Sequence, residues 1–146
     1  MQLPLKVDLS GQVAVVTGGG GILCGAMAEA LAACGAKVAV LDLRQAAADA
    51  VANAIRNSGG EAPGLAADVL QPDSLAAAAA KLAATFGPCD ILVNGAGGNH
   101  PKGTTGRETL TPEDLARKTE GLVSFYDLDP AGIQFVFNLN FLGTLL

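Results

Sequence analysis

The sequence predicts an α/β fold in which a doubly wound parallel sheet lies between two layers of helices. Four short apolar runs of the kind found in buried strands alternate with three helical stretches. The links between them are short, which favours parallel strands joined by right-handed crossovers. These connections predict strand order 3-2-1-4, a Rossmann-like arrangement, with residues 1–146 as one domain.

Each expected element has its own signal. The apolar runs, as strands, are Val13–Thr17, Lys37–Leu41, Pro63–Ala67 and Asp90–Val93. The helical stretches are Gly25–Ala33, Arg44–Asn57 and a third that starts around Gln71 and runs to Phe86. Glycines at Gly35, Gly59 and Gly87 are typical of helix ends, and Pro72 suits a first helical turn.

A glycine-rich turn joins the first strand to the first helix. Glycine allows a positive φ and lets a phosphate approach without meeting a Cβ, and we expect Gly21 to need both properties. The helix start adds N–H groups and the positive end of a dipole. The pattern Gly19-x-Gly21-x-x-Cys24 is close to a dinucleotide fingerprint, although a flexible turn in a chain with 19 glycines is the alternative. The expected cofactor contacts here are Thr17, Gly18, Gly19, Gly20, Gly21, Ile22 and Leu23.

Polar residues follow the strands at their carboxyl ends, where such sheets bind ligands. Asp42 comes about 20 residues after the glycines and can accept hydrogen bonds from an adenosine ribose, which favours NAD over NADP. Arg44 leaves NADP open, because a nearby arginine can accommodate the 2′-phosphate. Asp68 could reach the adenine, or could simply turn the chain into the next helix. The expected contacts at these ends are Asp42, Arg44, Asp68, Val69, Asn94, Gly95, Ala96 and Gly97.

Composition excludes several function classes. The net charge of −5 argues against a nucleic-acid partner. No apolar run reaches the length of a membrane span, and Met1–Gly11 lacks the apolar core of a signal peptide. The three cysteines have no zinc-site spacing, so we expect no metal site and reduced thiols in the cytoplasm.

Residues 98–130 form a long polar insertion after the fourth expected strand. Loops of this length in a compact domain are usually functional or disordered, and this one could cover a cofactor crevice. His100 and Lys102 bring hydrogen-bonding and cationic groups to an acidic protein. A short helix at Pro112–Lys118, capped by Thr111, is expected within it.

Several motifs resemble those of the short-chain dehydrogenases/reductases over the whole chain. They are Asp8-Leu9-Ser10-Gly11, Thr17-Gly18, Asp42, Asp68-Val69, Asn94-Gly95-Ala96-Gly97 and Asn140-Phe141-Leu142-Gly143. The segments GGGGILCGAMA, NGAGGNHPKGTT and FYDLD resemble the branch of D-mannonate oxidoreductases, or fructuronate reductases.

This resemblance implies NAD-dependent hydride transfer between a nicotinamide and a secondary alcohol or ketone of a sugar acid. It also implies a homo-oligomer, a dimer or tetramer. Asn140 would hold a water of the catalytic proton relay, and the alternative is that it caps a buried turn. His100 and Lys102 are candidates for binding the sugar-acid substrate, and the alternative is that they belong to a solvated loop.

Two departures from the family pattern stand out. The family spacing would place glycines at Ile22 and Cys24, and the catalytic Tyr-x-x-x-Lys is absent, because Pro130 stands four residues after Tyr126. The stretch from Ile133 onward is apolar on nearly every face. We therefore expect the amino-terminal half of a longer enzyme. The alternative is a noncatalytic nucleotide-binding fragment, and a methyltransferase on the same sheet is less favoured.

Overall fold

The computed structural model describes residues 7–117 and 121–146. Contacts divide the chain into two compact units. The first unit comprises the residues up to Ala96 together with Leu146, and the second comprises Gly97–Leu145. The four-stranded sheet lies in the first unit, and the expectation of one domain over residues 1–146 stays a prediction.

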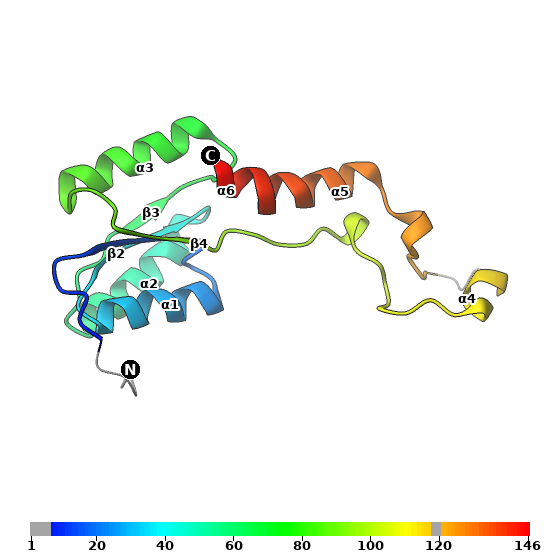
Figure 1. Cartoon of the computed structure of the whole chain (residues 1–146), viewed down its shortest axis with the longest axis horizontal. Coiled ribbons are helices and arrows are strands. Elements are labelled where there is room, and N and C mark those ends of the chain that lie inside the picture. The colour runs from blue at the N-terminus through cyan, green and yellow to red at the C-terminus, as the bar shows by residue number, and fades with distance from the viewer. Residues whose placement is uncertain (1–6, 118–120) are drawn as a thin grey trace. The chain divides into compact units, whose positions relative to one another are not determined.

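The sheet of the first unit has four parallel strands in the order β3-β2-β1-β4, which confirms the predicted order (Figure 1). The strands are β1 Val13–Thr17, β2 Lys37–Asp42, β3 Gly64–Ala66 and β4 Ile91–Asn94. Thr17 pairs with Leu41 on one side and Asn94 on the other. The carboxyl ends of β2, β1 and β4 are therefore level with one another.

Helices cover both faces of this sheet (Figure 1). They are α1 Ile22–Ala33, α2 Gln45–Asn57 and α3 Pro72–Thr85. Successive side chains of β1 point to opposite faces, as in any strand. Ala14 and Val16 enter an apolar core with α1 and α2, whereas Val13 and Val15 enter a second core with α3. The first unit thus has the three layers that the alternating sequence predicts.

Helix α1 begins at Ile22, three residues before the predicted start at Gly25. Gly21 is its N-cap in extended conformation, and Gly25 lies buried inside the helix. A Cβ built on Gly25 would lie 3.2 Å from Cγ2 of Val51 on α2, so a glycine allows the two helices to pack closely. The packing of α1 against α2 therefore accounts for Gly25, which the sequence analysis took as the first residue of the helix.

The second unit is a chain of short helical elements. These are η1 Pro101–Gly103, α4 Pro112–Arg117, η2 Phe125–Asp127, α5 Pro130–Phe137, η3 Asn138–Leu142 and α6 Gly143–Leu145. The predicted end of the short helix, Lys118, lies outside the described residues. The apolar stretch from Ile133 is helical, but η3 is a wider π turn that the sequence did not predict.

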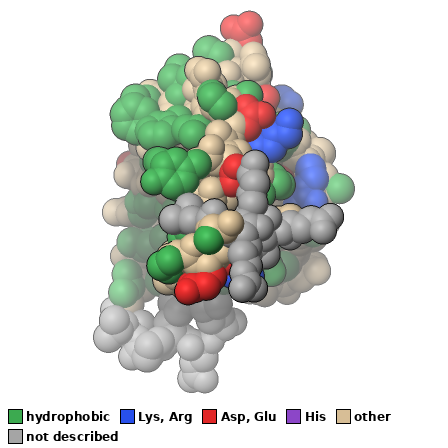
Figure 2. Space-filling view, turned by 90° about the vertical axis from the view of Figure 1, so that its right-hand side faces the viewer, with side chains coloured by type: hydrophobic (Ala, Val, Ile, Leu, Met, Phe, Trp, Pro, Cys, Tyr) green, Lys and Arg blue, Asp and Glu red, His purple; other side chains and the backbone are tan. Residues whose placement is uncertain are grey.

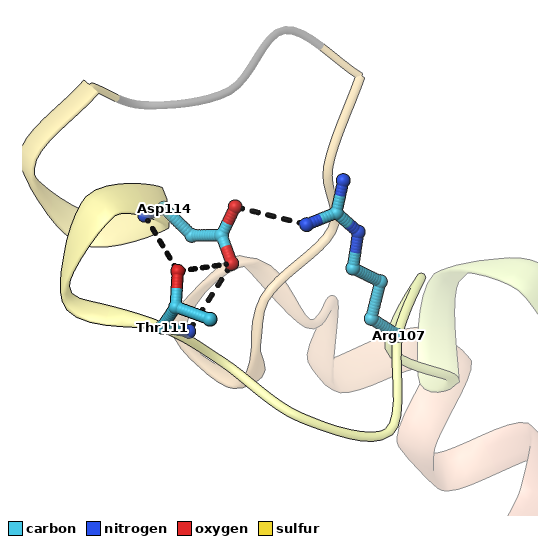
Figure 3. Close-up of polar contacts among 3 residues, drawn as sticks. All are labelled: Arg107, Thr111 and Asp114. Atoms are coloured by element: carbon cyan, nitrogen blue, oxygen red, sulfur yellow. Dashed lines mark hydrogen bonds and ion pairs between the residues drawn. The ribbon is translucent and has the colours of Figure 1, made fainter.

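A capping network holds the start of α4 (Figure 3). The Asp114 carboxylate accepts hydrogen bonds from the Thr111 amide and hydroxyl, and the Asp114 amide donates to that hydroxyl. Arg107 pairs with the other carboxylate oxygen at 3.0 Å. Because Asp114 is buried, the arginine and the two threonine groups satisfy a charge that would otherwise be costly. Thr111 is the predicted cap, and its role is structural.

Several large apolar side chains remain exposed, among them Phe125, Tyr126, Phe137 and Phe141. On the face shown in Figure 2, hydrophobic side chains gather at the upper left and basic side chains at the right. Within residues 7–117 and 121–146, no helix is long and apolar enough to cross a membrane.

Candidate functional site

The hydroxyl of Thr17 joins the end of β1 to the segment after β4. Its side chain is buried, and Oγ1 accepts hydrogen bonds from the amides of Gly95, at 3.1 Å, and Ala96, at 3.2 Å. The same hydroxyl donates to the carbonyl of Val93 at 3.5 Å. The structure therefore brings Thr17, Gly95 and Ala96 together, as their positions at neighbouring strand ends predicted.

Gly18 is the glycine that the loop conformation requires. Its φ is +63°, and a Cβ there would lie 2.8 Å from the Gly95 carbonyl oxygen and 2.9 Å from the Cα of Ala96. Side chains other than hydrogen are strained at such a φ and would clash here. The expectation of a positive φ at Gly21 was wrong, because Gly21 is an extended N-cap with φ −82°.

The loop amides divide into those that are already bonded and those that are open. The amides of Gly19, Gly20 and Gly21 donate to Leu41 O, Asp42 Oδ2 and Gly18 O at 2.8, 3.1 and 3.0 Å. The amides of Ile22, Leu23 and Cys24 open α1, where no earlier helical carbonyl can accept them. No acceptor within the described part of the chain takes these three. The open amides, which could bind an anion, are thus at the helix start with its positive dipole end, because those of Gly19, Gly20 and Gly21 are already bonded.

The Asp42 carboxylate lies at the end of β2, with 12% of its side chain exposed. One oxygen accepts from Gly20, and the other accepts from the Arg44 amide at 3.0 Å. A carboxylate has about four lone-pair sites, so acceptor capacity remains for ribose hydroxyls. The Arg44 guanidinium lies 3.7 Å from Asp42 and its side chain is 75% exposed, so this ion pair contributes little.

Asp68 and Val69 lie between β3 and α3. The Asp68 carboxylate accepts from the Leu70 amide at 2.9 Å, and the Asp68 amide donates to the Ser74 hydroxyl at 3.0 Å. Val69 is buried. Asp68 therefore turns the chain into α3, which was the alternative to an adenine contact, and its second carboxylate oxygen has no donor among the residues described.

In the second unit, the Asn140 side chain is bonded on both sides to Gly98. Oδ1 accepts from the Gly98 amide at 3.0 Å, and Nδ2 donates to the Gly98 and Val136 carbonyls, each at 2.8 Å. Both amide protons are therefore used, and a relay water could only donate to Oδ1. Asn140 lies within the π turn η3, and such turns are frequent at functional sites.

His100 and Lys102 lie on the same segment as Gly98. The Nδ1 atom of His100 accepts a hydrogen bond from the Lys102 amide at 3.2 Å. The imidazole packs against the Phe135 ring, with centroids 5.2 Å apart and a 54° tilt. The Lys102 ammonium lies 3.6 Å from the Asp129 carboxylate, and the two side chains are 69% and 41% exposed.

Sequence reasoning missed Asp129 and Phe135. Asp129 precedes Pro130 and caps α5 by accepting from the Ala131 amide at 2.8 Å. This Asp-Pro pair is a recognisable helix start that could have been found. Nothing in the sequence pairs Phe135 with His100. Within the described residues, no group of three or more His, Cys, Asp and Glu side chains could hold a metal ion.

Comparison with known proteins adds family information to this geometry. The family model described as short chain dehydrogenase matches residues 12–146. An "Uncharacterized oxidoreductase" of Haemophilus influenzae is 44% identical over 146 residues, which is all of this chain and 50% of that protein. The "Uncharacterized oxidoreductase UxuB" of Bacillus subtilis is 44% identical over 144 residues, which is 99% of this chain and 50% of that protein.

One solved structure is similar in both sequence and fold. It is the crystal structure of "a putative D-Mannonate oxidoreductase" from Haemophilus influenzae "with bound NAD". The TM-score is 0.87 at 45% identity, and the match covers 95% of this chain and 48% of that one. The chain thus spans about half the length of the relatives it matches.

Proposed function

The chain belongs to the short-chain dehydrogenase family, and on that basis we propose that it binds NAD in an oxidoreductase acting on sugar acids. The reaction would transfer a hydride between the nicotinamide and a secondary alcohol or ketone, of the D-mannonate and D-fructuronate type. The NAD and the name of the similar solved structure support the cofactor and the substrate class. NADP is the less favoured cofactor.

The observation that carries the proposal is the pairing of open amides with a carboxylate at one edge of the sheet. Ile22 and Leu23 present unbonded N–H groups at the start of α1, where a pyrophosphate would accept them. Asp42 ends the neighbouring strand, and its carboxylate accepts a hydrogen bond from the Gly20 amide of the same loop. A dinucleotide needs an anion site beside an acceptor for its ribose, and these residues offer both.

The residues of this chain would bind the cofactor and orient it toward the substrate. The cofactor, when bound, would supply the chemistry of hydride transfer. Thr17 fixes Gly95 and Ala96, so the backbone after β4 is held beside the loop. The proposed cofactor contacts remain the loop residues, Asp42, Arg44, Asp68 and the segment after β4. Asn140 is proposed as a positioning residue whose side chain holds Gly98.

The proposed partners are the sugar-acid substrate and further copies of the same protein in a dimer or tetramer. The exposed aromatic side chains of Phe137 and Phe141 support such an assembly, because large exposed apolar side chains can mark interaction surfaces. The second candidate function is noncatalytic nucleotide binding. It is favoured by the single tyrosine, Tyr126, which lacks a lysine four residues later.

The test combines binding and turnover in the whole protein that contains this chain. NADH binding is followed by fluorescence, and NAD reduction is followed with D-mannonate and with D-gluconate. Binding with turnover supports the oxidoreductase, and binding without turnover supports the second candidate. If neither nucleotide binds, the proposal fails at its first step.

A further inference from the structure

A strap, residues 98–103, runs antiparallel to the helical elements α5 and η3 in the second unit. Gly98 is bonded to Asn140, the His100 ring packs on Phe135, and the Lys102 carbonyl accepts from the Asp129 amide at 2.9 Å. As the residue numbers rise along the strap, the residue numbers of its partners on the helical elements fall, so the two segments run in opposite directions. The strap, which the sequence analysis assigned to a long polar insertion, is therefore held along its length by contacts with α5 and η3.

Two glycines set the distance between the strap and α5. A Cβ built on Gly132 would lie 2.6 Å from the carbonyl carbon of Lys102, and one on Gly103 would lie 2.7 Å from the Gly132 carbonyl oxygen. Side chains at these positions would push the two backbones apart. This close approach of the two backbones keeps the His100 ring within packing distance of the Phe135 ring.

The orientation and tautomer of His100 follow from this arrangement. Nδ1 accepts from the Lys102 amide, so the neutral ring carries its proton on Nε2. The His100 carbonyl accepts from the Gly103 amide at 2.8 Å and the Thr104 hydroxyl at 3.0 Å, which fixes the backbone under the ring. Nε2 has no partner in the part of the chain that the structure describes. His100 is only partly buried, so this donor is accessible.

Lys102 differs from His100 because its side chain already has a partner within the second unit. Its ammonium pairs with Asp129, whose other carboxylate oxygen caps α5. Lys102 also supplies the amide that orients His100 and the carbonyl that accepts from Asp129. Its contacts are those of a residue that holds the strap in place.

We propose that His100 determines substrate specificity by donating a hydrogen bond from Nε2 to an oxygen of the sugar-acid substrate, with Lys102 and Phe135 as positioning residues. The inference rests on the proposed function and deepens it. A preoriented donor suits a hydroxyl or carboxylate oxygen, and a site built to bind such an oxygen rejects analogues that lack it.

The test replaces each ring nitrogen separately in the whole protein that contains this chain. The amide nitrogen of His100→Gln can take the place of Nε2, whereas His100→Asn places its amide near Nδ1. His100→Ala removes both. KM and kcat for D-mannonate and the Kd of NADH are measured for each variant.

We expect H100A and H100N to raise KM at least about tenfold, the effect of one lost hydrogen bond, and H100Q to stay within about threefold of the parent. The Kd of NADH should be unchanged in all three, because His100 is not a proposed cofactor contact. In ¹⁵N NMR of the parent, the Nε2 signal should be that of a protonated nitrogen and should shift when D-mannonate is added.

Other outcomes overturn the inference in distinguishable ways. If the parent oxidises D-mannonate and H100A has the same KM, the role of His100 is wrong and the proposed function stands. If the parent binds NADH but neither binds nor oxidises D-mannonate, the proposed substrate class fails, and this inference with it. A protonated Nδ1 in the parent would overturn the tautomer even if the variants fail to fold.

Discussion

The carboxylate of Asp42 accepts a hydrogen bond from the backbone amide of Gly20, 3.1 Å away. The residue that ends β2 thus holds the loop that follows β1. A Cβ built on Gly20 would lie 2.9 Å from the same oxygen and 2.6 Å from the Cβ of Ala47, so only glycine permits the contact. The side chain that holds the loop is therefore also the one proposed to set the choice of cofactor.

Cofactor preference should follow from this carboxylate. We expect NADH to bind at least tenfold more tightly than NADPH, about 1.4 kcal/mol, because like charges placed together cost several kcal/mol. Asp42→Asn keeps an oxygen for the Gly20 amide but lowers the repulsion, so the preference should shrink more than the NADH affinity. Fluorescence titrations with both nucleotides measure this.

A matched control removes a carboxylate at the opposite end of the strands. Glu61 pairs with Lys37, the first residue of β2, at 3.6 Å. Glu61→Gln changes the net charge equally and should leave the preference intact. Equal NADH and NADPH affinities in the parent would mean that Arg44 dominates over Asp42.

Gly18→Ala should lower stability and abolish NADH binding together. The φ of +63° costs an L-residue about 1–2 kcal/mol, and the clash with Gly95 and Ala96 adds to it. Gly59→Ala is the control, since Gly59 has φ +89° but nothing within 4 Å of its Cβ. Urea unfolding should show a loss of about 1–2 kcal/mol for G59A and a larger one for G18A. Equal losses would contradict the close approach at Gly18.

Gly21→Val should weaken NADH binding while leaving the fold nearly as stable. Gly21 has φ −82°, which valine tolerates, and its Cβ would meet only the Gly18 carbonyl oxygen, at 3.2 Å. A branched side chain beside the open amides of α1 would obstruct a phosphate. The loss of binding free energy should therefore exceed the loss of unfolding free energy that urea denaturation measures for the same substitution. Unchanged affinity would move the pyrophosphate away from this turn.

The strand order and the position of Asp42 could be predicted because both depend on local patterns. Apolar runs mark buried strands, and short crossovers between them leave few topologies. The start of α1 was misplaced because glycine has a low helix propensity, and Gly25 is kept for close packing rather than for a turn.

The second unit was less predictable because its contacts are long-range. The bond between Gly98 and Asn140 joins residues 42 apart in sequence, and no local pattern indicates it. The same holds for the packing of His100 on Phe135 and for the π turn around Asn140. The sequence identified Asn140, His100 and Lys102 as candidates. Only the geometry shows which side-chain atoms of each residue are already bonded within the second unit.

The Thr17 hydroxyl should contribute measurably to stability. Thr17→Val keeps the shape of the side chain but leaves the amides of Gly95 and Ala96 without their acceptor. An unsatisfied buried polar group costs about 1–3 kcal/mol, and two amides are affected. Thr17→Ser retains the hydroxyl and should lose less than Thr17→Val in urea unfolding. If the valine variant is as stable as the parent, the hydroxyl does not hold this edge.

The 146-residue chain by itself should bind NADH without oxidising a sugar acid. Its only tyrosine, Tyr126, has proline four residues later, so the chain contains no Tyr-x-x-x-Lys pair for proton transfer. General acid–base catalysis typically contributes about 10²–10⁴-fold, and its loss should put NAD reduction with D-mannonate or D-gluconate below detection. The chain should also self-associate, because Leu92 on the edge strand β4 and Phe137 and Phe141 are exposed. Absorbance assays and light scattering on purified chain test both points. A monodisperse monomer that turns over D-mannonate would show that another side chain supplies the proton and that the exposed apolar surface is tolerated.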